Sequence, residues 1–162
     1  MKSTNFITLS LACIGLFLAG CMTMPAPADQ SDYAGFEYVT NVEGLKKDAL
    51  YEGVKLWVAE NFRSAKQVLD FENKDQGIII CNGVIPNIVL DTGMIKMPQQ
   101  AAFKMKVEVK DDKMRLSFTQ YQIIGRTNDS LFKDEVAQIR AQLSKFGDSI
   151  AIYLKNPRDK SF

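Results

Sequence analysis

Few side chains in this sequence could carry out covalent or acid–base chemistry. It contains three cysteines, Cys13, Cys21 and Cys81, and no histidine. The lack of histidine excludes Ser–His and Cys–His catalytic pairs and removes the commonest zinc ligand. Cys81 follows three isoleucines without a neighbouring cation or base, so we expect a buried apolar residue rather than a nucleophile. The carboxylates are scattered, and their spacing predicts neither a metal site nor a cofactor.

Cys21 is the cysteine whose surroundings indicate chemistry. It ends the run Leu18-Ala19-Gly20-Cys21, which follows Lys2 and an apolar stretch too short to span a bilayer. This arrangement resembles the lipobox of bacterial lipoproteins. The resemblance implies cleavage between Gly20 and Cys21, a diacylglycerol on the Cys21 thiol, and an acyl chain such as palmitate on the freed amine. The alternative is an ordinary secretory signal in which Cys21 is incidental.

The lipobox predicts a protein of the cell envelope, held to a membrane by lipid on Cys21. Residues 1–20 are then a signal peptide, and 21–34 a lipidated, flexible tether containing prolines. The residues after Cys21 include no dense acidic run and no adjacent aspartate, which favours the outer membrane, facing the periplasm. Loss of Lys2 with the signal leaves 19 basic and 19 acidic residues. This balance argues against nucleic acid as a partner.

A second pattern with chemical potential is Ile88-Val89-Leu90-Asp91-Thr92-Gly93. It is similar to the active-site strand of retroviral-type aspartic proteases, in which aspartates from two chains face each other. A homodimeric hydrolase acting through Asp91 is therefore the alternative function. Such proteases are nearly all β, whereas two amphipathic helices bracket this region. We therefore favour a turn at Asp91 and a protein that is not an enzyme.

The best candidate for binding is a row of cations along two neighbouring strands. Between residues 103 and 109 apolar side chains alternate with charged ones, and the next strand does the same. The candidate face consists of Lys104, Lys106, Lys110 and Arg115, continued by Ser117, Thr119 and Tyr121. Asp70 and Glu72 on a nearby strand partly neutralise it. Envelope proteins or anionic envelope polymers would suit this face, and the alternative is a solvated polar surface.

The elements that position these residues follow from periodicity. A helix is expected from about residue 46 to 62, because Leu50, Val54, Trp57, Val58 and Phe62 form one apolar stripe with Trp57 in the core. Strands are expected at 36–40, 66–72, 77–82, 103–109 and 114–119, and 83–100 reads as irregular because Pro86 and Pro98 interrupt it.

A second helix is expected from the capping cluster at 127–130 to about residue 155. Its apolar repeat lasts only about three heptads, so packing on a sheet is favoured over a helical zipper. The domain then spans 35–156 and is followed by a loose tail at 157–162. Since each readable strand has one polar face, we predict an α+β fold: one antiparallel sheet of about five strands, order β-α-β-β-β-β-α, with both helices on one face.

Between residues 36 and 124 a series of landmark residues follows in a definite order. They are Gly44-Leu45, Asp48, Leu50-Tyr51, Trp57, Glu60-Asn61-Phe62, Ser64-Ala65-Lys66, Lys74-Asp75, Gly77, Ile79-Ile80 and Gly83, and then Val107-Glu108-Val109-Lys110-Asp111 with Met114-Arg115-Leu116. With these landmarks, about residues 36–124 resemble a bacterial domain family of unknown function with a TATA-binding-protein-like fold. Lys46 departs from the family, which usually has a Ser-like cap there, as does Cys81-Asn82. The resemblance implies the same architecture and an envelope location, but supplies no catalytic residues.

Overall fold

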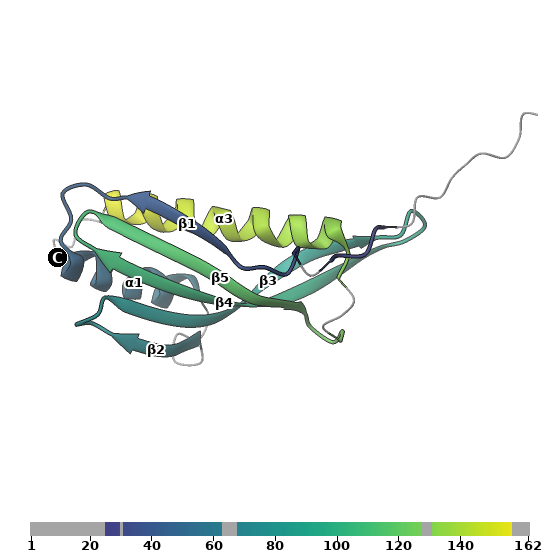
Figure 1. Cartoon of the computed structure of the whole chain (residues 1–162), viewed down its shortest axis with the longest axis horizontal. Helices are drawn as coiled ribbons and strands as arrows, with labels where there is room; N and C mark the ends of the chain where they lie inside the picture. The colour runs from purple at the N-terminus through teal and green to yellow at the C-terminus, as the bar shows by residue number, and fades with distance from the viewer. Residues whose placement is uncertain (1–24, 30, 63–67, 128–130, 157–162) are drawn as a thin grey trace, which may run out of the picture.

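The computed structural model describes residues 25–29, 31–62, 68–127 and 131–156, so the lipobox and the tail at 157–162 lie outside the described residues. Within these ranges, five strands and two helices follow in the order β-α-β-β-β-β-α (Figure 1). They are β1 (Phe36–Asn41), α1 (Lys47–Asn61), β2 (Leu69–Asn73), β3 (Ile78–Asp91), β4 (Lys96–Lys110), β5 (Lys113–Ile123) and α3 (Lys133–Lys155).

The strands form one antiparallel sheet in the order β1-β5-β4-β3-β2. Strands β2 to β5 are joined as successive hairpins, and β1 pairs with the outer edge of β5. Both helices lie against the same face of this sheet (Figure 1). The predicted α+β fold and its element order are therefore confirmed.

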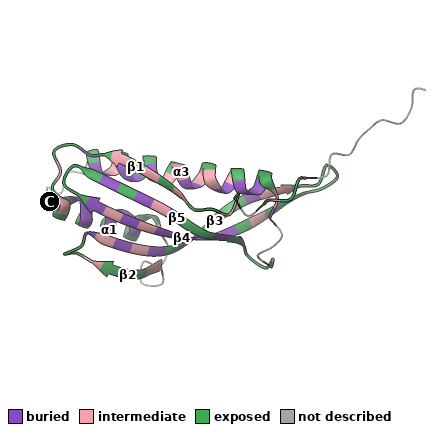
Figure 2. Cartoon of the chain, in the orientation of Figure 1, coloured by how far each residue is buried: buried purple, intermediate pink, exposed green. Residues whose placement is uncertain are grey.

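The core lies between the helices and the inner face of the sheet. On β4 the odd-numbered residues from Ala101 to Val109 are buried and the intervening ones reach solvent (Figure 2). Trp57 is 2 % exposed, and its ring packs edge-on against Phe62 and Phe146, each 5.9 Å away between ring centroids. Its predicted place in the core is confirmed.

Helix α1 begins without a cap from its own sequence. Lys46 precedes the first turn but makes no side-chain capping bond. Instead, the Asp111 carboxylate in the β4–β5 turn accepts a hydrogen bond from the Lys47 backbone N–H at 2.9 Å and pairs with the Lys46 ammonium at 3.0 Å. A distant turn thus satisfies the helix N-terminus.

The segment 83–100 is not irregular, and that expectation was wrong. It forms the outer halves of β3 and β4, which pair as far as Asp91 and Lys96. Pro98 fits because β4 pairs with β5 only as far as Ala101, so beyond that point one side of β4 is a sheet edge. Pro86 fits because it lies in a bulge, where Pro86 and Asn87 oppose the single residue Gln100 between Ile85 and Ile88.

A second bulge changes the prediction for Tyr121. Gln120 and Tyr121 oppose only Phe103, and Gln120 takes a left-handed conformation with φ 54°. The extra residue shifts the alternation, so Tyr121 turns inward, is 5 % exposed and donates its hydroxyl to the Ala34 carbonyl at 2.7 Å. Strict alternation predicts that Tyr121 lies on the outer face, and the structure corrects this prediction.

The later part of the segment predicted as a flexible tether, from Pro25 on, makes ordered contacts with the domain. Ala28 donates its backbone N–H to the Leu131 carbonyl at 2.8 Å, and Lys133 donates to the Ala26 carbonyl at 3.0 Å. Pro27 forms a β-bridge with Phe132. The residues from Pro25 are therefore attached to the start of α3, because their backbone groups find partners there. That helix begins at Lys133, after the predicted capping cluster, of which residues 128–130 lie outside the described residues.

Candidate binding site

The four predicted cations do lie on or beside the uncovered face of the sheet. Lys104, Lys106 and Lys110 share β4, and Arg115 projects from β5 opposite Glu108. Three of them have carboxylate neighbours: Lys104 pairs with Asp70 at 3.0 Å, Lys106 with Glu108 at 3.1 Å, and Arg115 with Glu108 at 2.8 Å. Lys110 is exposed at the end of β4, opposite Lys113.

These ion pairs determine the charge that the face presents. Partial burial raises the pKa of Glu108, but the bonds from Lys106 and Arg115 outweigh it, so the pKa stays below its usual value. Glu108 is therefore ionised at neutral pH and offsets charge from both cations. An anionic partner would have to replace the carboxylates in these half-exposed ion pairs, each of which stabilises the fold by up to about 1 kcal/mol. Binding of such a partner stays a prediction.

Asp91 lies at the end of β3, where the chain turns into β4. Its carboxylate accepts a hydrogen bond from the Gly93 backbone N–H at 2.9 Å and pairs with Lys96 at 3.2 Å, and both interactions lower its pKa. An aspartic-protease pair instead requires one carboxylate to stay protonated at working pH. The exposed, stabilised carboxylate of Asp91 favours the interpretation as a turn.

Cys81 is completely buried on β3. Removal from solvent raises the pKa of its thiol to about 12, so the thiolate is not formed at neutral pH. The expectation of a buried cysteine is confirmed. Within the described ranges, no group of three or more acidic or cysteine side chains is placed to hold a metal ion.

A groove of about 1300 Å³ lies where the two bulges flank β4. Pro86 and Asn87 form one bulge in β3, and Gln120 and Tyr121 form the other in β5, on either side of residues 99–104. Bulges bend and twist a sheet locally, which opens a hollow at this level. The groove lining includes the strand residues Asn82, Val84, Gln100, Ala102, Gln120 and Gln122. Its lining also includes the buried residues Gly83, Phe103 and Tyr121, and Tyr33, Asn61, Phe62 and Val68 from neighbouring segments.

The groove is rich in amides and poor in charge. Gln100, Gln120 and Gln122 are exposed on its strands, and each amide can both donate and accept hydrogen bonds. Val84 is 47 % exposed and adds an apolar contact. Lys104 is the lysine of the lining, and it is paired with Asp70. Such a surface can hold a polar, uncharged ligand or a backbone segment.

Sequence reasoning missed this groove for a physical reason. It depends on two register shifts, and a bulge is defined by pairing between strands rather than by one strand alone. Gln100, Gln120 and Gln122 are a signal in the sequence, but the sequence predicts no strand over 83–100 that would carry Gln100.

A buried ion pair fixes α3 beside the groove's outer end. Glu135 is fully buried, and its carboxylate pairs with Arg126 and accepts bonds from the Gln99 amide at 2.9 Å and the Phe132 backbone N–H at 3.0 Å. No spacing in the sequence predicts this cluster, which joins β4, the segment after β5 and the first turn of α3.

The fold and this surface define an α+β sheet protein with one face covered by helices and the other open to solvent. The chain belongs to the family described as a domain of unknown function (DUF4468) with a TBP-like fold, whose model matches residues 36–124. The family resemblance stated from the residues is confirmed.

Two solved structures share this architecture. A DUF4468 family protein from Bacteroides ovatus superposes with a TM-score of 0.53 at 12 % identity, covering 84 % of this chain and 94 % of that one. A TBP-like protein from Parabacteroides distasonis superposes with a TM-score of 0.58 at 11 % identity, covering 81 % and 97 %. At these identities the similarity shows the fold alone.

No curated protein matches the sequence well enough to suggest an activity. Among the described residues, no helix is both long enough and apolar enough to cross a bilayer.

Proposed function

We propose that this protein is a lipid-anchored, non-enzymatic binding module of the bacterial envelope, attached through Cys21 to the outer membrane and facing the periplasm. The anchor is supported by the run Leu18-Ala19-Gly20-Cys21 after a short apolar segment. The binding role is supported by one observation above others: the sheet carries a groove beside two bulges, and exposed amide side chains line it. Bulges of this kind are common beside functional sites.

The partner in this proposal is another envelope component, either a protein or an anionic polymer. The amide groove would recognise polar groups by hydrogen bonding. The neighbouring row of Lys104, Lys106 and Arg115 would attract an anionic partner once these cations exchange their ion pairs with Asp70 and Glu108 for it. Hydrolysis through Asp91 is not part of the proposal, because that carboxylate is held ionised at an exposed turn.

The anchor is tested by fractionation. The unaltered protein should sediment with membranes and carry acyl chains on its N-terminal peptide, whereas Cys21→Ala should not be acylated and should leave the membrane fraction. An unaltered protein that is soluble and lacks acyl chains would contradict the anchor.

The binding site is tested by photo-crosslinking in intact cells, with the crosslinker at Gln122 in the groove and at Asp75 in the far turn as control. We expect a discrete product at Gln122 alone. Two variants then separate the parts of the face: Gln100→Ala with Gln120→Ala alters the groove, and Lys104→Glu with Lys106→Glu and Arg115→Glu reverses the cations. If both variants fold and keep every product of the parent, this face is only solvated surface.

A further inference from the structure

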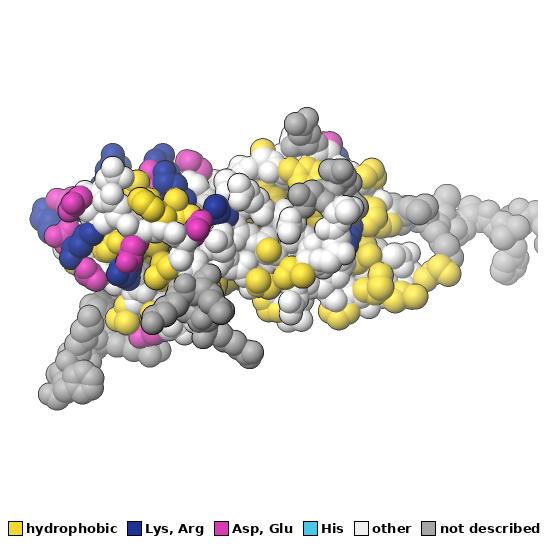
Figure 3. Space-filling model, turned by 90° about the horizontal axis from the view of Figure 1, so that it is seen from below, with side chains coloured by type: hydrophobic (Ala, Val, Ile, Leu, Met, Phe, Trp, Pro, Cys, Tyr) yellow, Lys and Arg dark blue, Asp and Glu magenta, His cyan; other side chains and the backbone are white. Residues whose placement is uncertain are grey.

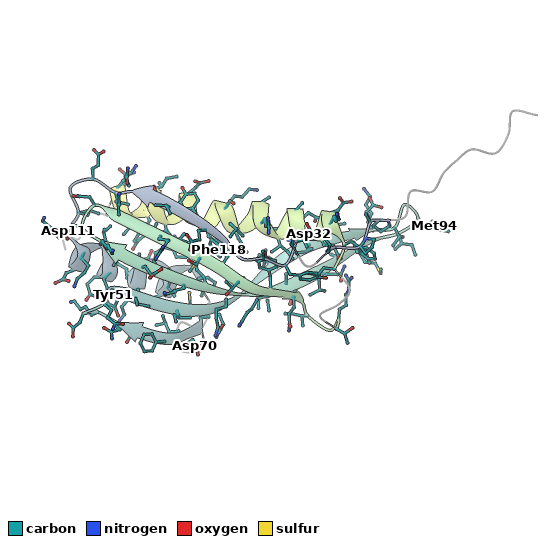
Figure 4. All side chains as sticks on the ribbon, in the orientation of Figure 1. Asp32, Tyr51, Asp70, Met94, Asp111 and Phe118 are labelled. Carbon is teal, nitrogen blue, oxygen red and sulfur yellow. The ribbon has the colours of Figure 1, made fainter. Side chains whose placement is uncertain are left out.

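The hairpin of β3 and β4 carries an apolar tip that projects from the molecule. Met94 is 75 % exposed, Ile95 62 % and Met97 43 %. We call these three residues the apolar tip. Figure 4 shows Met94 at one extreme of the long axis, with Asp111 at the other. Large apolar side chains grouped at a projecting end are a feature of interaction sites.

The tip is held in a defined shape. Thr92 and Ile95 are linked through backbone and side-chain bonds of 3.2 Å, and Asp91 pairs with Lys96 at 3.2 Å. Further back, the Gln138 amide of α3 bonds both the N–H and the carbonyl of Val89, at 2.8 and 2.9 Å. The hairpin is thus braced against a helix, and the single ion pair leaves its end with no net charge.

The described chain begins at the same end of the molecule. Pro27 pairs with Phe132 beside the first turn of α3, the helix that also braces the hairpin. Figure 1 shows this first segment, in purple, next to the outer part of the hairpin. Pro25 is four residues after Cys21, and four residues span at most about 14 Å. A lipid on Cys21 would therefore hold this end close to the membrane.

The charged side chains of the molecule are concentrated away from the hairpin end. Figure 3 shows acidic and basic side chains gathered at the end opposite the hairpin and apolar side chains over the hairpin end. A membrane interface accepts apolar side chains and excludes unpaired charges.

We propose that the apolar tip inserts into the same lipid surface that holds Cys21, as a second point of membrane contact. This inference rests on the proposed lipid anchor. Two contacts orient the domain, so that the long axis points away from the membrane and the groove stands at a fixed height above it. One acylated point alone would let the domain pivot.

Quenching by lipids tests the proposal on the full lipidated chain. The Met94→Cys variant is labelled with an environment-sensitive fluorophore, and the protein is reconstituted into vesicles of phosphatidylethanolamine and phosphatidylglycerol containing a nitroxide-labelled lipid. Selective labelling is feasible because Cys81 is fully buried and acylation occupies the Cys21 thiol. Asp75→Cys, at the charged end, is the matched control.

We expect strong quenching and a blue-shifted emission at position 94, and neither at position 75. Adding Ile95→Asp and Met97→Asp to the Met94→Cys chain should abolish both signals while the protein still floats with the vesicles. Flotation without quenching at position 94 would overturn the tip contact and leave the anchor intact. A chain that lacks acylation and does not float would overturn the anchor and the inference with it.

Discussion

The surroundings of Cys81 and Asp91 determine which protonation state each side chain favours. Cys81 is fully buried, and the pKa of its thiol is raised to about 12 by loss of solvent. Asp91 is exposed, and the pKa of its carboxylate is lowered by the Gly93 N–H and by Lys96. Burial thus favours the protonated form of the Cys81 thiol, and the contacts of Asp91 favour its ionised form. Neither has the poised protonation that nucleophilic or acid–base catalysis requires.

Alkylation should show the inertness of Cys81. In the native protein at pH 8, we expect no modification of the peptide containing Cys81 by iodoacetamide, because the thiolate is scarce and the side chain inaccessible. Unfolding in urea should make the same peptide react completely, as measured by mass spectrometry. An added surface thiol, Asp75→Cys, should react in both states. Rapid labelling of Cys81 in the native state would contradict its assignment to the core.

At the scale of elements, a turn caps α1 and a bulge sets the direction of side chains on β5, and neither feature is specified by the element's own local sequence. The Asp111 carboxylate caps α1 across the fold, and its pKa is lowered by the Lys47 N–H and the Lys46 ammonium. Gln120 holds a left-handed conformation so that Tyr121 and Ile123 can face the core. The Asp111 cap and the Gln120 bulge each involve a few neighbouring residues, and each determines how whole helices and strands pack together.

The cap predicts a particular dependence on pH. Because the folded-state pKa of Asp111 lies below its unfolded value, its stabilisation is present above about pH 4 and is lost as pH falls through the folded-state pKa. We expect the urea midpoint of Asp111→Asn to lie below that of the unaltered protein at pH 6, with the difference shrinking toward pH 2.5. Asp75→Asn is the control. A difference that is constant over this range would rule out the charge as its source.

The β5 bulge predicts that two substitutions of Gln120 differ in their effect on stability. Gln120→Val should lower the free energy of unfolding by about 1–3 kcal/mol, since a β-branched residue is strained at positive φ. Gln120→Gly should stay within about 1 kcal/mol of the unaltered protein, because glycine adopts this conformation without strain. Urea denaturation followed by the fluorescence of Trp57 measures both. Equal effects would show that position 120 does not need the left-handed conformation.

The whole molecule is elongated, with three regions along its length. Charged side chains lie at the end with the Asp111 turn, the amide groove lies at the middle bulges, and the apolar tip lies at the opposite end (Figures 3 and 4). Glu135 connects elements at the hairpin end, because its carboxylate contacts Arg126, Gln99 and the start of α3.

Glu135 should therefore matter more than its neighbour Asp134. Glu135→Gln should lower the free energy of unfolding by about 2–4 kcal/mol, since it leaves the partly buried Arg126 without its carboxylate. Asp134→Asn, an exposed change in the same helical turn, should cost within about 0.5 kcal/mol. Urea denaturation of both variants at pH 7 checks the difference. Similar values for the two would mean that the ion pair does not hold α3 to the hairpin.

The sequence alone determined the fold class and the placement of most of the core. Alternation at 103–109 and 114–118 and the stripe through Trp57 specify which side faces inward, because local periodicity reports burial directly. It also identified the family and the cations of the open face. It could not assign their partners: Glu108 neutralises Arg115 only because β4 and β5 pair in this register.

Only the tertiary structure decided the outer hairpin, the two bulges, the cap of α1 and the Glu135 cluster. Prolines at 86 and 98 read as breaks along the chain, yet a bulge and a sheet edge accommodate them. The cap of α1 also depends on tertiary contact, because Asp111 and Lys47 are 64 positions apart in the sequence. These features depend on pairings between distant residues, and local periodicity carries no information about such pairings.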